Sequence, residues 1–247
     1  MAVLAVFSAL VPSPPTAAAP LEGNPLIEIS AGAFAFGSED GEENEAPRRT
    51  LTLSAFRINK FEITNRLYNA FVEASGHRPA FFRDHPVLGR PDHPVVGVSW
   101  DDADAFCRYQ GMKLPTERQW ERAARSASGR RFAWGDAPPT RDRVSRGTAV
   151  CCGPDDRDGF LTTAPVGSFP AGNTEEDLAD MTGNVWEWVD GWYGSYDMTG
   201  AVHETEYRLL RGGAWNSDEW KLRTTYRMAY RSEFRFAANG GFRCAVD

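Results

Sequence analysis

Residues 93–125, HPVVGVSWDDADAFCRYQGMKLPTERQWERAAR, carry the pattern of two consecutive amphipathic helices. Ser99 can cap the first helix, whose first turn is acidic and therefore suits the helix dipole. Thr116 and Gln119 follow Pro115 with the spacing of a capping box, which predicts the start of the second helix. The residues expected to face the core are Ala103, Phe106, Cys107, Trp120, Ala123 and Ala124.

Shorter patterns lie upstream of these helices. Residues 26–39, LIEISAGAFAFGSE, alternate around Gly32 and Gly37, which predicts a β-hairpin. Residues 51–63, LTLSAFRINKFEI, alternate well enough to predict one further strand. Thr64 can cap a third helix. The apolar face of that helix is formed by Leu67, Tyr68, Phe71 and Val72.

The second half of the chain has a different character. From about residue 126 it is rich in Gly, Pro, Asp, Trp and Tyr, and periodicity survives only in short strands predicted at 207–210 and 241–245. Loops of such length are usually functional, or are held by ions or cross-links. We therefore expect a single α+β domain over residues 23–247, with little regular structure and long loops.

Charge limits the kinds of partner. The chain of 247 residues has a formal net charge of −7, and phosphate binding needs a concentrated basic patch, so nucleic acid is not expected as a partner. Arginines are dense between Arg208 and Arg243, and we interpret them as structural partners of the many acids.

The N-terminal residues 1–20 contain no charge. Their apolar run, from residue 2 to 11, leads into prolines and an Ala-rich stretch that resembles a secretory cleavage site. We therefore predict a signal peptide and a periplasmic or secreted protein, with a disordered tail as the alternative. The run is too short to span a bilayer, and no later stretch is long enough, so no transmembrane segment is expected.

Seven phrases, in order, resemble the formylglycine-generating enzymes of the sulfatase-modifying factor family. They are FEITNRLYNAF, HPVVGVSWDDADAFCRYQGMKLPTERQWERAAR, FAWGD, DGFLTTAPVGSFPAGN, DMTGNVWEWVDGWY, LLRGGAWN and NGGFRCAVD. The resemblance implies an elaborated C-type-lectin-like fold. Because one fold can host many functions, each site has to be considered separately.

The family resemblance also bears on the four cysteines. It implies a disulfide between Cys107 and Cys244 that ties a helix to the last strand, and the alternative is a pair of buried thiols. Such a disulfide is typical of an oxidising compartment. Cys151 and Cys152 could form a vicinal disulfide, pair with another chain, or serve a metal or redox role.

Formylglycine-generating enzymes hold Cu(I) with two closely spaced thiolates. In this chain the first of those positions aligns with Ser217 or Asp218 and the second with Leu222 or Arg223. Oxygen and hydrocarbon cannot replace sulfur as ligands of this soft ion. The resemblance therefore implies a member of the family without the catalytic cysteine pair, and no copper is expected.

Two stretches resemble the structural Ca²⁺ sites of the family. Calcium takes six to eight oxygen ligands from carboxylates and carbonyls on bending loops. The first predicted site uses Asp180, the carbonyls of Gly183 and Val185, and Glu187. The second uses Asp158 and the carbonyl of Phe160, and it lacks an upstream asparagine. The alternative is that these acids cap turns or pair with arginines.

Family resemblance also indicates a ligand-binding groove. Aromatic side chains with a few polar groups suit a peptide, a protein or a small peptide-derived ligand. We expect either a calcium-stabilised binding or accessory module, or a maturation enzyme that tailors a peptide-derived substrate, as the pyoverdine-maturation relative is thought to do. The predicted groove residues are Trp186, Trp215, Asn216, Ser217, Asp218, Trp220, Tyr226 and Arg227.

Overall fold

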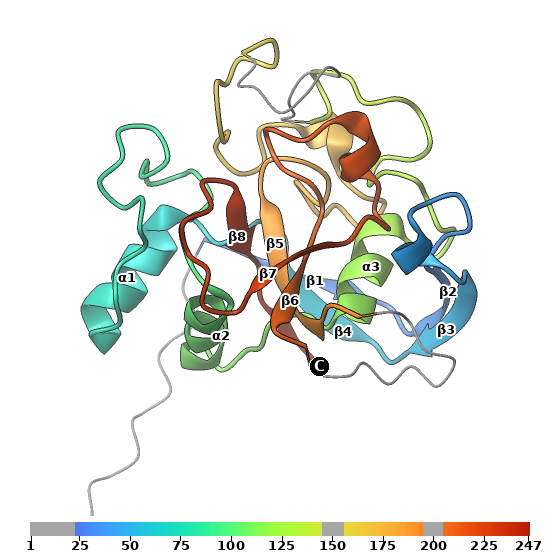
Figure 1. Cartoon of the computed structure of the whole chain (residues 1–247), viewed down its shortest axis with the longest axis horizontal. Helices are drawn as coiled ribbons and strands as arrows, with labels where there is room; N and C mark the ends of the chain where they lie inside the picture. Colours follow the sequence, from blue (N-terminus) through green and yellow to red (C-terminus); the bar gives the residue numbers. More distant parts are fainter. Residues whose placement is uncertain (1–22, 145–155, 195–204) are drawn as a thin grey trace, which may run out of the picture.

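The computed structural model describes residues 23–144, 156–194 and 205–247, and this part of the chain folds into three small sheets and three α-helices. Figure 1 shows a central sheet with α1 and α2 toward one side and α3 toward the other. The helices are α1 (Asn65–Ser75), α2 (Trp100–Tyr109) and α3 (Glu117–Arg125). Short 3-10 helices are η1 (Glu43–Glu45), η2 (Pro170–Gly172) and η3 (Glu219–Leu222).

The central sheet has four strands in the order β7-β6-β5-β8. Strand β5 runs parallel to β8 and antiparallel to β6, which in turn is antiparallel to β7. Helices α2 and α3 both pack against β5, and its residues from Trp186 to Val189 are all buried. The strands are β5 (Trp186–Trp192), β6 (Tyr207–Arg211), β7 (Met228–Arg231) and β8 (Gly240–Phe242).

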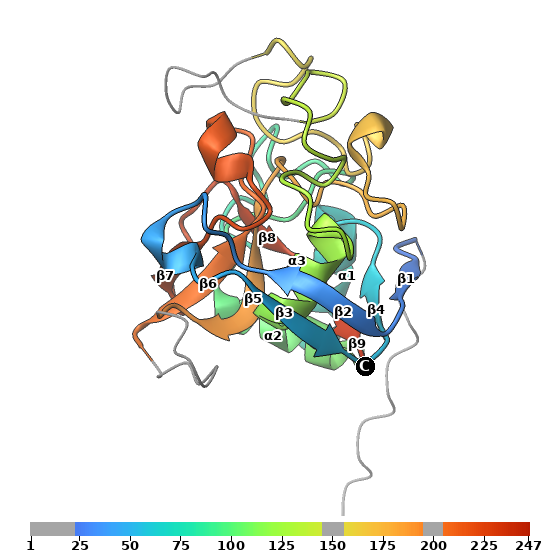
Figure 2. The same cartoon turned by 90° about the vertical axis from the view of Figure 1, so that its right-hand side faces the viewer.

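Two smaller sheets, formed by N-terminal strands and by the C-terminal strand β9, face the viewer in Figure 2. Strand β4 lies between β1 and β9 in a three-stranded sheet, and β2 pairs with β3. The pairing of β4 with β9 joins the first sixty residues to the last three. The strands are β1 (Leu26–Ile29), β2 (Gly32–Phe36), β3 (Arg49–Leu53), β4 (Phe56–Asn59) and β9 (Ala245–Val246).

The three predicted helices begin where the capping residues indicate. Thr64 accepts a hydrogen bond from the Leu67 amide at the start of α1. Complete capping boxes stand at the start of α2 (Ser99 with Asp102) and of α3 (Thr116 with Gln119). The predicted core faces are confirmed except at Val72, which is only half-buried against the core. The buried side chains are Leu67, Tyr68, Phe71, Ala103, Phe106, Cys107, Trp120, Ala123 and Ala124.

The predicted hairpin at residues 26–39 is wrong. Strands β1 and β2 do form, but they belong to different sheets, because β1 pairs with β4 and β2 pairs with β3. The single strand predicted over residues 51–63 is likewise two strands: β3, which pairs with β2, and β4, which pairs with β1. Alternation predicted strands in these segments but could not identify the partner of each.

Cys107 and Cys244 form the disulfide that the family resemblance implies. It joins α2 to the segment between β8 and β9, with Cα atoms 5.6 Å apart, and both residues are fully buried. Cys151 and Cys152 lie outside the described residues. No helix in the described part of the chain has the length and apolar character needed to cross a bilayer.

The disulfide predicts a measurable loss of stability on its removal. The cross-link spans 137 residues, so the double variant Cys107→Ser/Cys244→Ser should lose up to about 4–5 kcal/mol of unfolding free energy through the added freedom of the unfolded chain. Urea unfolding measures this difference. Native protein in reductant is the control and should approach the value of the variant. An unchanged midpoint in both samples would contradict the prediction.

Candidate functional site

The loop after β6 occupies the region where the family resemblance places catalytic cysteines. Gly212 and Gly213 both have positive φ angles, 98° and 78°, which glycine adopts without strain. A Cβ atom at Gly213 would lie only 2.7 Å from Cδ2 of Leu222. The glycine pair therefore allows the loop to fold tightly back on itself.

Ser217 closes a turn at the first cysteine position. Its hydroxyl accepts a hydrogen bond from the Ala214 amide at 2.9 Å, and its own amide donates to the Ala214 carbonyl at 2.8 Å. Only 3% of Ser217 is exposed. Asp218, the other residue that could align here, caps η3 by accepting from the Lys221 amide and forms an ion pair with the Lys221 ammonium at 3.1 Å. Both residues therefore make hydrogen bonds that shape the loop.

Structural contacts also fill the second cysteine position. Leu222 is fully buried and packs with Phe132 and Val144. Arg223 makes two hydrogen bonds of 2.7 Å to the buried carboxylate of Glu45. Burial alone would raise the pKa of Glu45, but its hydrogen bonds, led by those from Arg223, hold that pKa below the ordinary value. Neither residue offers a ligand for a soft metal ion.

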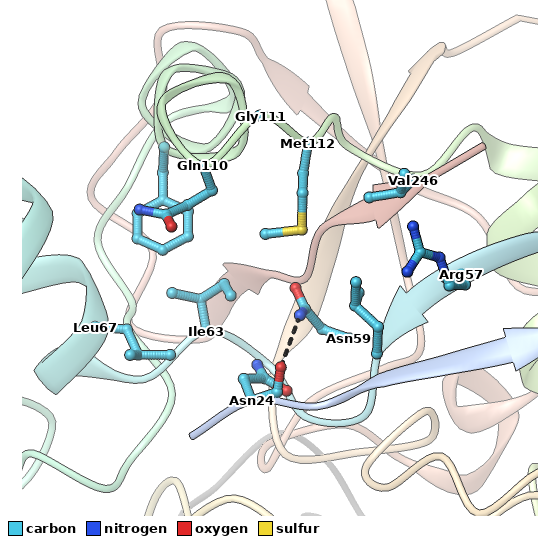
Figure 3. Close-up of a pocket in the computed structure, with 11 residues that line it drawn as sticks. Asn24, Arg57, Asn59, Ile63, Leu67, Gln110, Gly111, Met112 and Val246 are labelled. Atoms are coloured by element: carbon cyan, nitrogen blue, oxygen red, sulfur yellow. Dashed lines mark hydrogen bonds between the residues drawn. The ribbon is translucent and has the colours of Figure 1, made fainter. Parts of the chain in front are cut away.

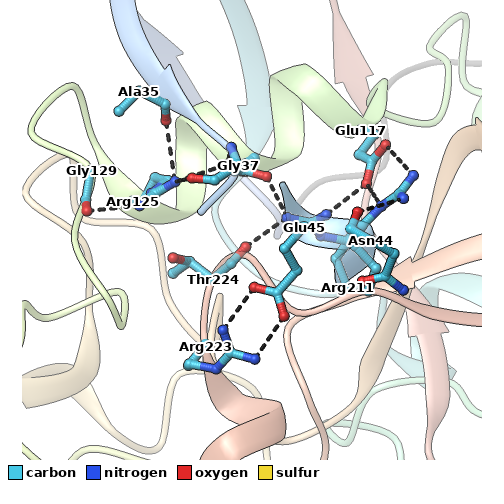
Figure 4. A network of polar contacts seen from close by, with 12 residues as sticks. Ala35, Gly37, Asn44, Glu45, Glu117, Arg125, Gly129, Arg211, Arg223 and Thr224 are labelled. Carbon is cyan, nitrogen blue, oxygen red and sulfur yellow. Dashed lines mark hydrogen bonds and ion pairs between the residues drawn. The ribbon is translucent and has the colours of Figure 1, made fainter. Parts of the chain in front are cut away.

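A buried network of arginines and glutamates anchors this loop to α3, as Figure 4 shows. Arg211 is fully buried and donates to Glu117 and Glu121, both at 2.6 Å, and to the Thr224 carbonyl at 2.7 Å. Glu117 also pairs with Arg227 at 2.7 Å. The prediction that arginines in this region act as structural partners of acids is confirmed at Arg211, Arg223, Arg227 and Arg243.

The predicted groove residues divide into an interior and an accessible group. Trp186 and Arg227 are buried, and Arg227 is engaged by Glu117 and by two carbonyls. Trp220 is the most accessible member, with 42% of its surface exposed. Its indole N–H donates to the Glu42 carboxylate at 2.6 Å, and the Arg223 guanidinium lies over its ring, 3.9 Å from the centroid. The part-buried members are Trp215, Asn216, Asp218 and Tyr226, and Ser217 is buried.

The part-buried members are fixed by specific contacts. The Trp215 indole donates to the Ala238 carbonyl at 3.1 Å, and the Asn216 side chain accepts from Asn239 at 2.9 Å. The Tyr226 ring lies 5.8 Å from that of Trp186. Segment 214–226 therefore combines accessible aromatic side chains with a backbone held by buried polar contacts, and it can present a preformed surface.

The first predicted calcium site lies beside β5, among buried carboxylates. Asp180 has a left-handed backbone with φ of 56° and accepts from the Gly167 amide at 2.6 Å. The Glu187 carboxylate accepts three hydrogen bonds, one from Trp120 and two from Arg243, at 2.7–2.8 Å. A carboxylate has about four acceptor positions, so Glu187 keeps about one for a further ligand.

Glu62 was not identified by the sequence analysis, yet it belongs to the same buried group. One of its oxygens accepts from Asn184 at 2.8 Å, and the other has no hydrogen-bond partner within the described ranges. Burial and repulsion from Asp180 and Glu187 raise the pKa of Glu62 well above its ordinary range. Its only signal in the sequence is an acid next to a strand, which a surface residue shares.

The negative charge of the three buried carboxyl groups would suit a bound cation. Burial raises the pKa of Asp180 to about 6, although a hydrogen bond from Gly167 and the charge of Arg243 oppose the shift. Glu62, Asp180 and Glu187 are counterbalanced by Arg243, the cation that acts on all three. Among residues 23–144, 156–194 and 205–247, no three His, Cys, Asp or Glu side chains converge as metal ligands. Calcium here therefore depends on backbone carbonyls and stays a prediction.

The second predicted calcium site has one clear feature in the described residues. Asp158 accepts from the Phe160 amide at 2.8 Å, around Gly159 with φ of 96°. This contact is typical of an acid that closes a turn, which was the alternative to ligation. Calcium binding at Asp158 and Phe160 also stays a prediction.

Replacement of Asp180 by asparagine should stabilise the calcium-free protein above neutral pH. The folded protein keeps the proton on Asp180 up to about pH 6 whereas the unfolded chain loses it near pH 3.8, so stability falls as the pH rises through this window. Asp180→Asn is neutral and tolerates the same backbone. We expect a gain of up to about 3 kcal/mol at pH 8 in a chelator, measured by urea unfolding.

Asp177→Asn is the matched control for this variant. Asp177 also has a left-handed backbone, with φ of 66°, but its side chain is exposed and paired with Lys60, which lowers its pKa. This control should lose a little stability rather than gain it. Equal effects of the two variants at pH 8 would contradict the role given to burial at Asp180.

Comparisons with known proteins agree with this geometry. Residues 13–247 match the family model described as "Sulfatase-modifying factor enzyme 1-like domain". The chain is 34% identical to a formylglycine-generating enzyme of Streptomyces coelicolor, over 100% of this chain and 97% of the relative. It is 30% identical to inactive C-alpha-formylglycine-generating enzyme 2 of Bos taurus, over 89% of this chain and 87% of the relative.

Solved structures show the same fold. PvdO from Pseudomonas aeruginosa superposes with a TM-score of 0.77 at 23% identity, covering 90% of this chain and 94% of PvdO. Treponema denticola variable protein 1 superposes with a TM-score of 0.70 at 21% identity, covering 90% of this chain and 95% of that protein. The α+β, C-type-lectin-like fold expected from the sequence is confirmed, and the chain belongs to the sulfatase-modifying factor family of formylglycine-generating enzymes and their relatives.

Proposed function

We propose that the protein is a calcium-stabilised binding or accessory module that presents segment 214–226 to a peptide or protein partner. The observation that carries the proposal is the structural use of both cysteine positions. Ser217 closes a turn and Leu222 fills the core, so the loop is built for shape and not for metal ligation. The chain thereby keeps the family fold without the thiolate ligands that bind Cu(I) in formylglycine-generating enzymes.

No thiolate in the described residues is available as a substitute. Cys107 and Cys244 are joined to each other and buried, and they are the only cysteines described. The described residues therefore provide no pair of thiolates for copper-dependent formylglycine formation. A relative of Bos taurus that is named as an inactive formylglycine-generating enzyme supports the idea that the family contains members without this activity.

The accessible aromatic side chains suit recognition of a partner. Trp220 and Tyr226 expose ring surface, and rigid aromatic side chains bury a large area at little entropic cost. Glu42, Asp218 and Lys221 add charges around Trp220, which can orient a polar peptide backbone. The buried ion pairs beneath the loop keep this surface preformed.

A periplasmic or extracellular location completes the proposal. The Cys107–Cys244 disulfide persists in an oxidising compartment, and the uncharged residues 1–20 suit an export signal. Structural calcium would be held by Asp180, Glu187 and the carbonyls of Gly183 and Val185. It would balance the buried negative charge that Arg243 leaves uncompensated.

Calcium should raise the melting temperature of the native protein through Asp180. Binding only to the folded state stabilises it by RT ln(1 + [Ca²⁺]/Kd), about 2.7 kcal/mol at a hundredfold excess over Kd. The Asp180→Asn variant should lose this calcium response, whereas Asp177→Asn should keep it. A melting temperature that is the same in calcium and in chelator would contradict the proposed calcium site.

A sulfatase-type peptide tests whether the module binds or oxidises. We expect a C-x-P-x-R peptide, incubated with copper and oxygen, to stay free of aldehyde in mass spectrometry. Binding of the peptide, followed by fluorescence anisotropy, should weaken about tenfold in Trp220→Ala. Tyr207→Ala is the matched control, because Tyr207 is 43% exposed, close to the 42% of Trp220, and lies at the opposite end of β6 from the loop.

The outcomes separate the two readings of the site. Formation of aldehyde would show an enzyme and overturn the proposal. Equal binding to the native protein and Trp220→Ala, or absence of binding, would count against segment 214–226 as the docking surface. An unmodified peptide whose binding depends on Trp220 supports a binding module.

A further inference from the structure

A cavity lies on the outer face of the sheet β1-β4-β9. It has a volume of about 290 Å³, opens to solvent, and is bounded by that sheet, by Leu67 of α1 and by the end of α2, as Figure 3 shows. None of the residues that line it belongs to segment 214–226 or to the carboxylate group of Glu62, Asp180 and Glu187. The cavity is therefore separate from the site described above.

Strand register explains the lining of the cavity. Leu26 of β1 pairs with Asn59 of β4, and Arg57 of β4 pairs with Val246 of β9, so alternate residues bring these four side chains to one face. The intervening residues point to the opposite face, where Ile27, Ile29 and Ile58 contribute to the core. A one-residue change in register would remove the cavity.

The walls of the cavity are mainly apolar. Ile63 and Phe106, which line the cavity, are almost fully buried. Figure 3 shows Met112 extending into the cavity between α2 and β9. Protein interiors are close-packed, and apolar walls without neighbours lose dispersion contacts. Filling such a cavity with an apolar group is therefore favourable, because it removes apolar surface from water.

One end of the cavity is positively charged. Of the described residues that line it, Arg57 alone is charged, and Figure 3 shows its guanidinium beside Val246, at the end opposite Leu67. The Arg57 side chain is exposed, and no ion pair joins it to another described residue. The neighbouring amides are held in place, because Asn24 is bonded to the Phe61 backbone and Asn59 accepts from the Cys244 amide.

We propose that this cavity binds a small amphiphilic monocarboxylate, of the medium-chain fatty acid type. The carboxylate would pair with Arg57, whose planar guanidinium matches it with two parallel hydrogen bonds. The apolar body would lie against Ile63, Phe106 and Met112. Concave, mostly apolar cavities with one fixed charge are typical of sites for such ligands.

Decanoate is the probe for the experiment, titrated by calorimetry into the full chain with its disulfide intact. Decyltrimethylammonium, with the same chain and the opposite charge, is the matched ligand. Arg57→Gln should weaken decanoate binding about tenfold or more and should leave the cationic ligand unaffected or bound more tightly. Met112→Trp should abolish the binding of both by filling the cavity.

Two further variants make the test specific. Glu28 lies directly opposite Arg57 on β1 and does not line the cavity, so Glu28→Gln should tighten decanoate binding by removing a nearby negative charge. Arg66 lines a neighbouring cavity of about 320 Å³, so Arg66→Gln is the matched arginine control and should change nothing. If Met112→Trp fails to fold, the decanoate-induced shift of the Met112 methyl resonance reports occupancy instead.

Several results would overturn the proposal. Absence of saturable decanoate binding up to about 1 mM would do so. Binding that is insensitive to Arg57→Gln, or that is lost in Arg66→Gln, would do so as well. Each of these outcomes is independent of the peptide and calcium experiments, because the two sites share no residue.

Discussion

The buried pair of Arg243 and Glu187 joins the sheets of the molecule. Glu187 lies in β5, and Arg243 directly follows β8 and reaches the carbonyls of Asn59, Lys60 and Ala179 as well as both oxygens of Glu187. Its charge would be costly to bury alone, but the attraction of Glu187 keeps the pKa of Arg243 above its ordinary value despite that burial. An apolar pair of equal volume can give the same stability. Loss of one partner, however, leaves a buried charge uncompensated and strongly destabilises the fold, so the pair fixes how the sheets meet.

The same logic explains the loop after β6, where the family resemblance places the catalytic cysteines. The guanidinium group of Arg211 pairs with Glu117 and Glu121 in the protein interior. That of Arg223 pairs with the buried Glu45. The loop above them can then change its surface residues without losing its shape. A scaffold that keeps its shape while its reactive side chains are exchanged suits a family whose members differ in function on one fold.

Local chemistry made part of this structure predictable from the sequence. Capping residues such as Ser99 and Thr116 act within one helical turn, so the helices could be located with their buried faces. The pairing of the strands could not be predicted, since β4 pairs with a segment nearly two hundred residues away. Strand β5 could not be located either, because it lies within a phrase dominated by tryptophan and acids. The cysteine-free loop was predictable from its residue types, whereas Glu62 became recognisable only once burial placed it beside Asp180.

The position of β9 has a consequence for how the chain acquires its structure. The last eight residues supply β8's neighbour Arg243, the disulfide partner Cys244 and the strand that completes the sheet around β4. Contacts between sequence-distant segments form late because the intervening chain must first be ordered. The core around β4 and Cys107 therefore cannot close before residues 243–246 have been synthesised, so the strands and helices of the N-terminal half stay without these partners until then.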